Sequence, residues 1–229
     1  MRFDLFVAID FDGTIVEKDI TDEVIKEFAR PGWELAEEEW EKGVIGSREC
    51  LERQMALIEE PLDKVVKFVD RFEVDSTFPE FIAYLKKNHI PHGVVSDGFE
   101  AFSKRILSNA GLADTPVFAN LLKEADGRLK AFFPNSKPGC PSGTCKCMVT
   151  SGIGNGAPVI LIGDGRSDFC LGRKAGFVFA KRKLEVYCRE NGIPHAAFKD
   201  FTDVSRYIKS FEYHITNRIR ESAAAVKSL

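Results

Sequence analysis

The sequence of 229 residues has no apolar run of the roughly 20 residues that a membrane-spanning helix needs. Its first residues lack the basic start, the longer apolar stretch and the small-residue cleavage site of a secretory signal. A basic surplus is missing as well, since the formal net charge is -3, and a face that binds nucleic acid needs such a surplus. We therefore expect a cytoplasmic protein with no membrane partner and no nucleic-acid partner.

The six cysteines are few and unevenly spaced for a chain of this length. Disulfide scaffolds are short secreted chains with dense cysteines, so the pattern predicts reduced thiols. Cys140, Cys145 and Cys147 lie close together in the sequence but do not form the C-x2-C pairs typical of zinc sites. We expect them to be thiols without a metal. A structural zinc held by these three and a fourth ligand is the alternative.

Hydrophobic residues make up 44% and charged residues 29% of the sequence, which is enough for a sizeable folded core. Apolar runs of strand length alternate with segments of helical spacing along most of the chain. Strands that alternate with helices predict an α/β fold with a doubly wound parallel sheet. We expect strands at residues 5–9, 90–95, 159–162, 177–180 and 195–198, a hairpin at 117–122 and 129–133, and helices at 78–88 and 100–110.

Residues 19–70 differ from the rest, because their apolar side chains recur with helical spacing, as at Ile20, Val24 and Phe28. We therefore predict a helical cap that is inserted after the first strand, with an α/β core around it. The predicted bounds are 16–72 for the cap and 1–15 with 73–229 for the core.

Acidic and hydroxyl side chains directly follow three of the predicted strands. Any one such string is ordinarily an Asp/Gly turn that closes a strand. In a parallel sheet, however, ligands bind beyond the carboxyl ends of the strands, where these strings would meet. Their joint presence therefore favours a functional site. The strings are Asp10-Phe11-Asp12-Gly13-Thr14, Ser96-Asp97-Gly98 and Gly163-Asp164-Gly165-Arg166-Ser167-Asp168.

The D-F-D-G-T string after a buried strand resembles the signature of the haloacid-dehalogenase superfamily. Residues 4–210 as a whole resemble its phosphoserine-phosphatase-like branch, whose helical cap follows the first motif. The resemblance implies a Rossmann-like core and a Mg²⁺-dependent phosphatase that acts on a small phosphorylated metabolite. It also implies that Mg²⁺ is held by the side chains of Asp10 and Asp164 and by the backbone carbonyl of Asp12.

The residue types suit this chemistry. A phosphate monoester repels nucleophiles, and a carboxylate nucleophile divides its slow hydrolysis into two easier steps. Asp10 fits the nucleophile by its place in the motif, and Asp12 fits the general acid for the leaving oxygen and later the base for water. A hard cation such as Mg²⁺ holds carboxylate and phosphate together. Asp168 is expected to hold a metal-bound water or the catalytic lysine, and the alternative is an exposed acid in a first helical turn.

Phosphate binding is expected from Ser96, whose hydroxyl would donate to a phosphate oxygen, and from the backbone N–H groups of Asp97 and Gly98. The plain alternative for Ser96 is a helix N-cap. A cation opposite the metal would stabilise the phosphoryl oxygens. Family members place this lysine at the start of the helix before the last motif, which favours Lys146. The other lysines considered are Lys104, Lys123, Lys130 and Lys137.

Arg53 is the cation of the predicted cap that we place at the substrate, and a surface ion pair is its alternative. Trp33 and Trp40 are expected in the core of the cap or, alternatively, in the wall of the pocket. Phosphoserine phosphatases have a glutamate where this chain has Asp19 and an arginine where it has Gln54. Both differences disfavour phosphoserine as the substrate.

The stretch from Ala29 to Trp33 and the cysteine-rich run before Lys146 resemble the methionine-salvage phosphatases, which act on 2-hydroxy-3-keto-5-methylthiopentenyl phosphate. We predict this branch. Ser96-Asp97-Gly98 instead resembles the phosphoethanolamine/phosphocholine phosphatases, in which Asp97 would face a substrate cation.

A non-catalytic phosphate-binding or regulatory protein is the alternative from another class, because a fold does not fix a function. The presence of Asp10, Asp12 and Lys146 argues against it. Asp12 also argues against a true dehalogenase, whose leaving halide needs no general acid. The sequence leaves the oligomeric state open.

Overall fold

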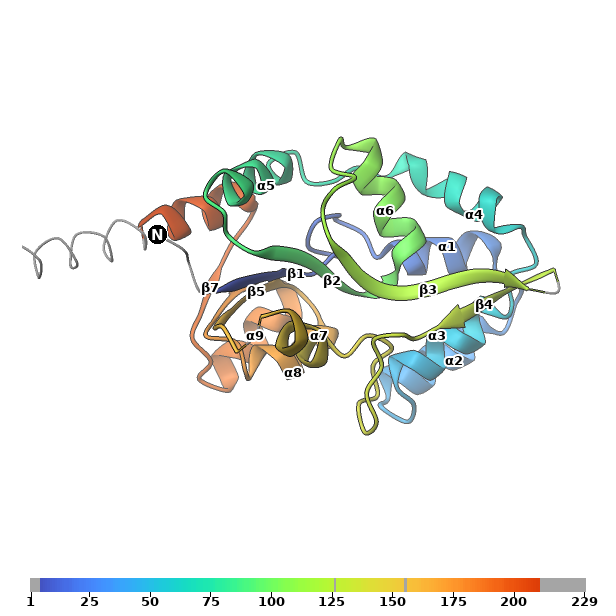
Figure 1. Cartoon of the computed structure of the whole chain (residues 1–229). Coiled ribbons are helices and arrows are strands. Elements are labelled where there is room, and N and C mark those ends of the chain that lie inside the picture. The colour runs from blue at the N-terminus through green and yellow to red at the C-terminus, as the bar shows by residue number, and fades with distance from the viewer. Residues whose placement is uncertain (1–4, 126, 155, 211–229) are drawn as a thin grey trace, which may run out of the picture.

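A seven-stranded sheet forms the centre of the computed structural model, which describes residues 5–125, 127–154 and 156–210 (Figure 1). The strand order is β4-β3-β2-β1-β5-β6-β7, and neighbouring strands are parallel except for the antiparallel pair β3 and β4. The predicted α/β fold with a doubly wound sheet is confirmed. The strands are β1 Phe6–Ile9, β2 His92–Phe99, β3 Val117–Ala125, β4 Arg128–Phe132, β5 Val159–Gly163, β6 Phe177–Ala180 and β7 His195–Ala197.

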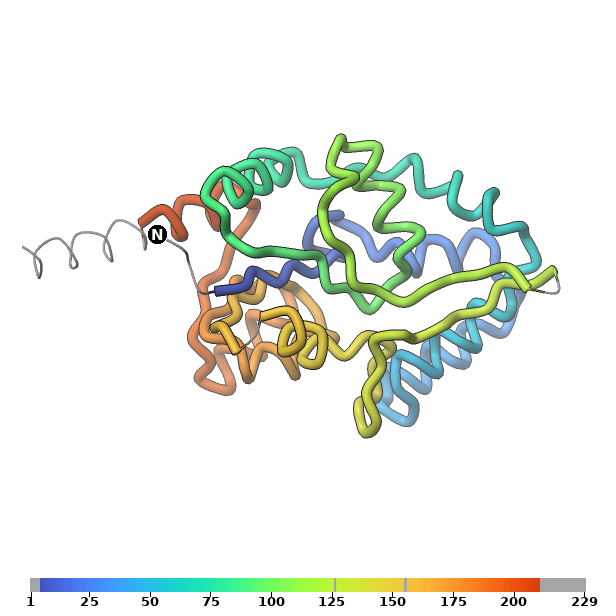
Figure 2. The backbone as a smooth tube through the Cα atoms, in the orientation of Figure 1, coloured from blue at the N-terminus to red at the C-terminus, as the bar shows by residue number. Residues whose placement is uncertain are grey.

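Helices cover both faces of the sheet, as the tube in Figure 2 shows. Successive residues of β1 therefore point into two different apolar clusters, Val7 and Ile9 into one and Phe6 and Ala8 into the other. Burial on both faces explains why this strand is apolar throughout instead of alternating. One face carries α5 (Phe78–Lys87), α6 (Glu100–Asn109) and the helical residues 201–210, and the other carries α7 (Lys146–Ile153), α8 (Phe169–Gly172) and α9 (Arg182–Glu190).

The segment between β1 and α5 is helical and lies at one end of the sheet (Figure 1). Asp19 caps the first of its helices by accepting a hydrogen bond from Asp22 N at 3.0 Å, and we call this segment the insert. The hairpin of β3 and β4, which the sequence assigns to the core, extends along the insert, where Leu62 N donates to Glu124 Oε2 at 3.2 Å. The insert contains α1 Ile20–Phe28, α2 Trp33–Glu41, α3 Ser47–Met55, α4 Leu62–Phe68 and the short 3-10 helix η1 Val69–Arg71.

Strand β2 begins at His92 and ends at Phe99, so it starts later and ends later than residues 90–95, the range predicted from its apolar run. It continues through Ser96 to Phe99, and its pairing with β3 shifts register between Val95 and Phe99. Ser96 and Gly98 thus belong to the strand itself, although the apolar pattern has ended. Among the described residues, no helix is long and apolar enough to cross a membrane.

Candidate active site

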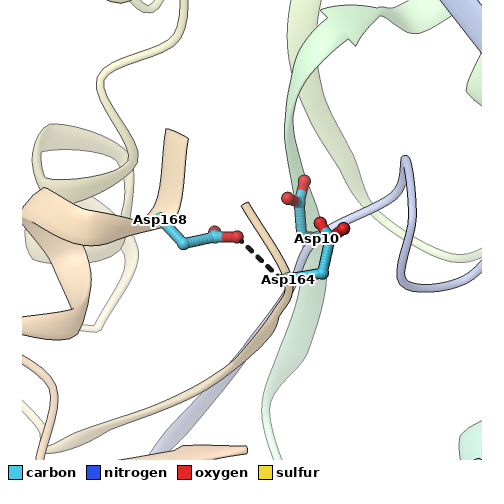
Figure 3. Close-up of side chains that lie close together, drawn as sticks. All are labelled: Asp10, Asp164 and Asp168. Carbon is cyan, nitrogen blue, oxygen red and sulfur yellow. Dashed lines mark hydrogen bonds between the residues drawn. The ribbon is translucent and has the colours of Figure 1, made fainter. Parts of the chain in front are cut away.

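Three aspartates meet beyond the carboxyl ends of the two central strands. Asp10 directly follows β1, Asp164 directly follows β5, and Asp10 N donates to the carbonyl of Ile162 at 2.8 Å. Asp168 ends the short 3-10 helix η2 (Arg166–Asp168) and points back toward the same place (Figure 3). One carboxylate oxygen from each of the three lies within 4.8 Å of the others. The sheet thus brings together residues that are far apart in the sequence.

Lys146, the first residue of α7, joins two of these carboxylates. Its Nζ lies 2.8 Å from Asp10 Oδ1 and 2.7 Å from Asp168 Oδ1, and the residue is only 3% exposed. Burial disfavours the charged amine, but the two adjacent carboxylates outweigh this effect and raise the pKa of Lys146. The lysine is therefore a permanent cation beside Asp10.

The negative charge of the aspartates exceeds what this lysine neutralises. Burial raises the pKa of Asp10 well above its ordinary value, Asp168 and Asp164 raise it further, and Lys146 opposes them. Burial and Asp168 likewise raise the pKa of Asp164. Within this group of three converging carboxylates, those of Asp10 and Asp164 fit a hard divalent cation with oxygen ligands, such as Mg²⁺, which would offset the repulsion.

Gly13 leaves space for this arrangement. Its φ of +70° suits glycine, and a Cβ at this position would lie 2.2 Å from Asp164 Oδ2. Any side chain here would displace the Asp164 carboxylate from the cluster.

Asp168 is held entirely by protein donors. Its Oδ2 accepts hydrogen bonds from the backbone N–H groups of Asp164 at 3.2 Å and Gly165 at 3.3 Å, while Oδ1 contacts Lys146. The residue is fully buried, so the alternative of an exposed acid in a first helical turn is wrong. These contacts hold Asp168 against the lysine and against the backbone of Asp164 and Gly165.

Asp12 contacts the start of the insert. Its Oδ1 accepts from Ile20 N at 2.8 Å, and Ser96 Oγ donates to its Oδ2 at 3.4 Å. Burial raises the pKa of Asp12 to about 6, so about a tenth of this carboxyl carries a proton at pH 7, far more than an ordinary aspartate would. Gly98 N donates to Ser96 Oγ at 2.9 Å, and a Cβ on Gly98 would lie 2.7 Å from Asp12 Oδ2.

Asp97 joins three separate parts of the chain. Its Oδ2 accepts from Ser47 Oγ of the insert at 2.5 Å, and its Oδ1 accepts from Thr144 N of the loop before α7 at 2.7 Å. Asn120 Nδ2 donates to its backbone carbonyl at 2.6 Å. Burial raises the pKa of Asp97, and these donors oppose the rise. Both carboxylate oxygens are therefore engaged by the protein, which favours a structural role over a contact with a substrate cation.

A cavity of 380 Å³ opens between the aspartates and the insert. The sequence did not identify the acidic wall that the insert contributes to it. The only sequence signal for this wall is the pair of acids at the start of α1, Asp19 and Asp22. The insert side chains that line the cavity are Asp19, Thr21, Asp22, Glu37, Trp40, Ser47, Cys50, Leu51 and Gln54.

Arg53 lies outside this cavity. Its guanidinium is exposed and bonded to Glu39 and Glu49, so placing it at the substrate is wrong and its surface ion-pair alternative is correct. One residue along α3, Gln54 faces the cavity and donates to Glu37 Oε2 at 2.9 Å. Neighbouring residues on a helix point about 100° apart, which accounts for the difference.

The cysteines have no geometry for zinc. All six are free thiols, and the three aspartates form the only group of three or more converging metal ligands within the ranges that the structure describes. Cys145 and Cys147 instead pack in the apolar cluster beneath α7.

Comparisons with known proteins agree with this geometry. The family description "haloacid dehalogenase-like hydrolase" matches residues 7–173. The chain is 30% identical over 220 residues to a 2-hydroxy-3-keto-5-methylthiopentenyl-1-phosphate phosphatase of Geobacillus kaustophilus, covering 93% of this chain and 99% of the relative. It is 29% identical over 218 residues to the enzyme of the same name from Brevibacillus brevis, covering 92% and 98%.

Solved structures are similar over most of their length. A phospho-aspartyl intermediate analogue of a phosphoserine phosphatase has a TM-score of 0.68 at 23% identity, with 90% of this chain and 99% of that chain covered. An apo phosphoserine phosphatase has a TM-score of 0.65 at 25% identity, with 88% and 98% covered.

Proposed function

The chain belongs to the haloacid dehalogenase-like hydrolases and is a phosphatase, and we propose that it hydrolyses a small phosphate monoester through a phosphorylated Asp10 with the help of Mg²⁺. The observation that carries the proposal is the buried Lys146 bridge to Asp10 and Asp168 at the carboxyl ends of β1 and β5. When bound at Asp10, Asp164 and the Asp12 carbonyl, Mg²⁺ would neutralise charge on the carboxylate and the phosphate.

The side chains then divide the reaction between them. One Asp10 oxygen is fixed by Phe11 N and Lys146 Nζ, both at 2.8 Å, which orients the carboxylate for attack on phosphorus. Asp12, with a pKa raised to about 6, donates a proton to the leaving oxygen and later takes one from the attacking water. Ser96 and the N–H groups after it are the donors that we assign to the phosphoryl oxygens.

The test is the substitution Asp10→Asn with a chromogenic phosphate as substrate. The amide cannot form an acyl phosphate, so turnover should fall by at least about 10³-fold while the thermal unfolding curve keeps its shape. Asp63→Asn, an exposed aspartate on α4, is the matched control and should leave activity unchanged. Beryllium fluoride should raise the melting temperature of the wild type and not that of Asp10→Asn. Near-wild-type turnover by Asp10→Asn would contradict the nucleophile assignment.

For the substrate, our first candidate is a neutral keto-enol phosphate of the kind for which the methionine-salvage relatives are named. The cavity contains apolar surface suited to such a chain, because Trp40 and Leu51 line it. Arg166 lies over the Trp40 ring at 5.2 Å and fixes this side of the wall.

A second candidate, an amine-bearing phosphate, is favoured by the acids of the insert. Asp19, Asp22 and Glu37 line the cavity with no cation from the insert beside them in the described lining. Desolvation and neighbouring carboxylates raise the pKa of Asp19 and Asp22, so a bound ammonium would relieve their repulsion. The buried Thr21 Oγ1 on the same wall has no hydrogen-bond partner among the described residues and can accept from such a group.

Asp22→Asn separates the two candidates. A charged hydrogen bond contributes about 1.5–3 kcal/mol, so its loss should lower kcat/KM for phosphoethanolamine by roughly 10- to 100-fold. A neutral sugar phosphate should be affected little, and Asp63→Asn should affect neither. Equal losses on amine-bearing and neutral substrates would contradict the second candidate and favour the first.

A further inference from the structure

Two thiols lie in contact next to the proposed catalytic residues. Cys147 Sγ is 3.3 Å from Cys170 Sγ, and neither belongs to a disulfide. Cys147 is buried in the first turn of α7, and Cys170 is exposed in α8. These are the only cysteines among the described residues for which a thiol–thiol contact is found.

The Cys147–Cys170 thiol pair joins the same two segments of the chain as the Lys146–Asp168 ion pair. Lys146 immediately precedes Cys147, Asp168 lies two residues before Cys170, and the Lys146–Asp168 contact is 2.7 Å. A bond between the sulfurs would therefore link the same two segments that the ion pair already joins. Any shift needed to form it would act on the lysine and the aspartate.

We propose that Cys147 and Cys170 are a modification site, at which a hydroperoxide produces a reversible disulfide that inactivates the enzyme. The inactivation rests on the proposed function, whereas formation of the bond does not.

The chemistry is balanced by one hydroperoxide. The Cys170 thiolate attacks the peroxide oxygen, the O–O bond breaks, and the products are a sulfenic acid and water or an alcohol. The sulfur of Cys147 then attacks the Cys170 sulfur, the S–O bond breaks, and hydroxide leaves with the thiol proton as water. Two thiols are oxidised by two electrons and one peroxide is reduced.

The environments of the two sulfurs fit this order. Exposure makes Cys170 the sulfur that meets the oxidant, and Cys147 S–H donates to it. Burial and Cys170 raise the pKa of Cys147 to about 12, which keeps Cys147 a thiol that the oxidant does not attack first. In the second step its proton passes to the departing hydroxide while its sulfur attacks Cys170.

Formation of the bond requires movement in the site. A disulfide has an S–S length of about 2.05 Å, so the sulfurs must approach by about 1.3 Å. Lys146 is held by contacts of 2.7 and 2.8 Å on two carboxylates, which leaves little freedom for its helix to follow. Because misplacement of a catalytic group by about 1 Å can cost 100-fold in rate, we expect at least a tenfold loss of turnover.

The experiment treats the full-length protein with hydrogen peroxide, alkylates the remaining thiols and maps cross-linked peptides by mass spectrometry. Wild type should gain a Cys147–Cys170 peptide, lose at least tenfold in chromogenic phosphate turnover and recover with dithiothreitol. Cys170→Ser should keep its activity through the same treatment, as should Cys147→Ser. Cys140→Ser, which removes a loop thiol outside the pair, should behave like wild type.

Each outcome is decisive. Absence of the cross-linked peptide, or a cross-link with unchanged turnover, would overturn the proposal. Inactivation that persists in Cys170→Ser would overturn it as well, because another thiol would then be responsible. If the reduced protein hydrolyses no phosphate monoester, the proposed function is wrong. Disulfide formation is then still tested by mass spectrometry of the cross-linked peptide and by its effect on the Mg²⁺-induced shift in melting temperature.

Discussion

Replacing Lys146 by methionine tests the bridge at the centre of the site. The substitution keeps a long side chain in a position that is 3% exposed and removes the charge that contacts Asp10 and Asp168. Removing one partner of a buried ion pair costs about 3–5 kcal/mol, because the other charge is left uncompensated. For a chain of this size each kcal/mol lowers the melting temperature by roughly 2–4 °C, which gives a decrease of about 6–20 °C.

The loss of stability should depend on pH. Without Lys146, the raised pKa of Asp10 rises further, and protonation at low pH relieves the repulsion. The decrease in melting temperature should therefore be smaller at pH 5 than at pH 7.5. Turnover should fall by about 10²-fold or more even at low temperature, where the variant is folded, because a group that stabilises developing charge is lost.

Calorimetry at two pH values and initial rates with a chromogenic phosphate measure these effects. Lys137→Met is the matched control, since Lys137 is an exposed lysine in the loop before α7. A Lys146→Met variant with turnover within threefold of wild type would refute the assignment of the lysine to the reaction. Equal stability losses at both pH values would refute the electrostatic reasoning.

Three further results are expected. EDTA should abolish turnover and Mg²⁺ should restore it, while excess Ca²⁺ should inhibit, because its looser coordination misaligns Asp10; full turnover after exhaustive chelation would contradict the metal proposal. In the metal-free protein the free energy of unfolding should fall as pH rises from about 4 to 7. The reason is that burial raises the folded-state pKa of Asp10, Asp12 and Asp164 above their unfolded values. Denaturant titrations should also show that Mg²⁺ stabilises the protein more at pH 7 than at pH 5. A folded phosphoprotein should be a poor substrate if the insert, which lines the cavity, closes over it as a cap, and rapid release of its phosphate would contradict a cap role.

The parts of the fold that were predictable depend on local patterns. The residues of β6, 177–180, coincide with their apolar run, because the strand is buried and ends where polar residues begin. Strand β2 was underestimated, since its last residues are small or polar and are held in the strand by long-range pairing to β3. The periodicity of apolar residues indicates which residues of a segment are buried. A residue that is held in a strand by pairing with a distant segment leaves no such pattern in its own sequence.

The site shows the same limit. Asp10 and Asp12 could be proposed because their motif marks a strand end, and Lys146 because family members place a lysine at the start of this helix. The sheet topology brings the three side chains together. The two donors to the Asp97 carboxylate were not found, because Ser47 and Thr144 are ordinary polar residues that reach it only after the insert and the loop have folded over β2. A serine at a helix start is equally consistent with a surface position, so the sequence could not distinguish these roles.

The place of β1 at the centre of the sheet has a consequence for how the protein is made. The ribosome releases β1 first, yet one of its two edges stays unpaired until β5 emerges, after the insert, β2, the hairpin and α7. Until then the nascent chain carries Asp10 and Asp12 without Asp164, and an open apolar strand edge that invites pairing with other chains. The proposed metal site is therefore complete only after translation of the β5 segment, and chains released before it would be the ones most in need of a chaperone.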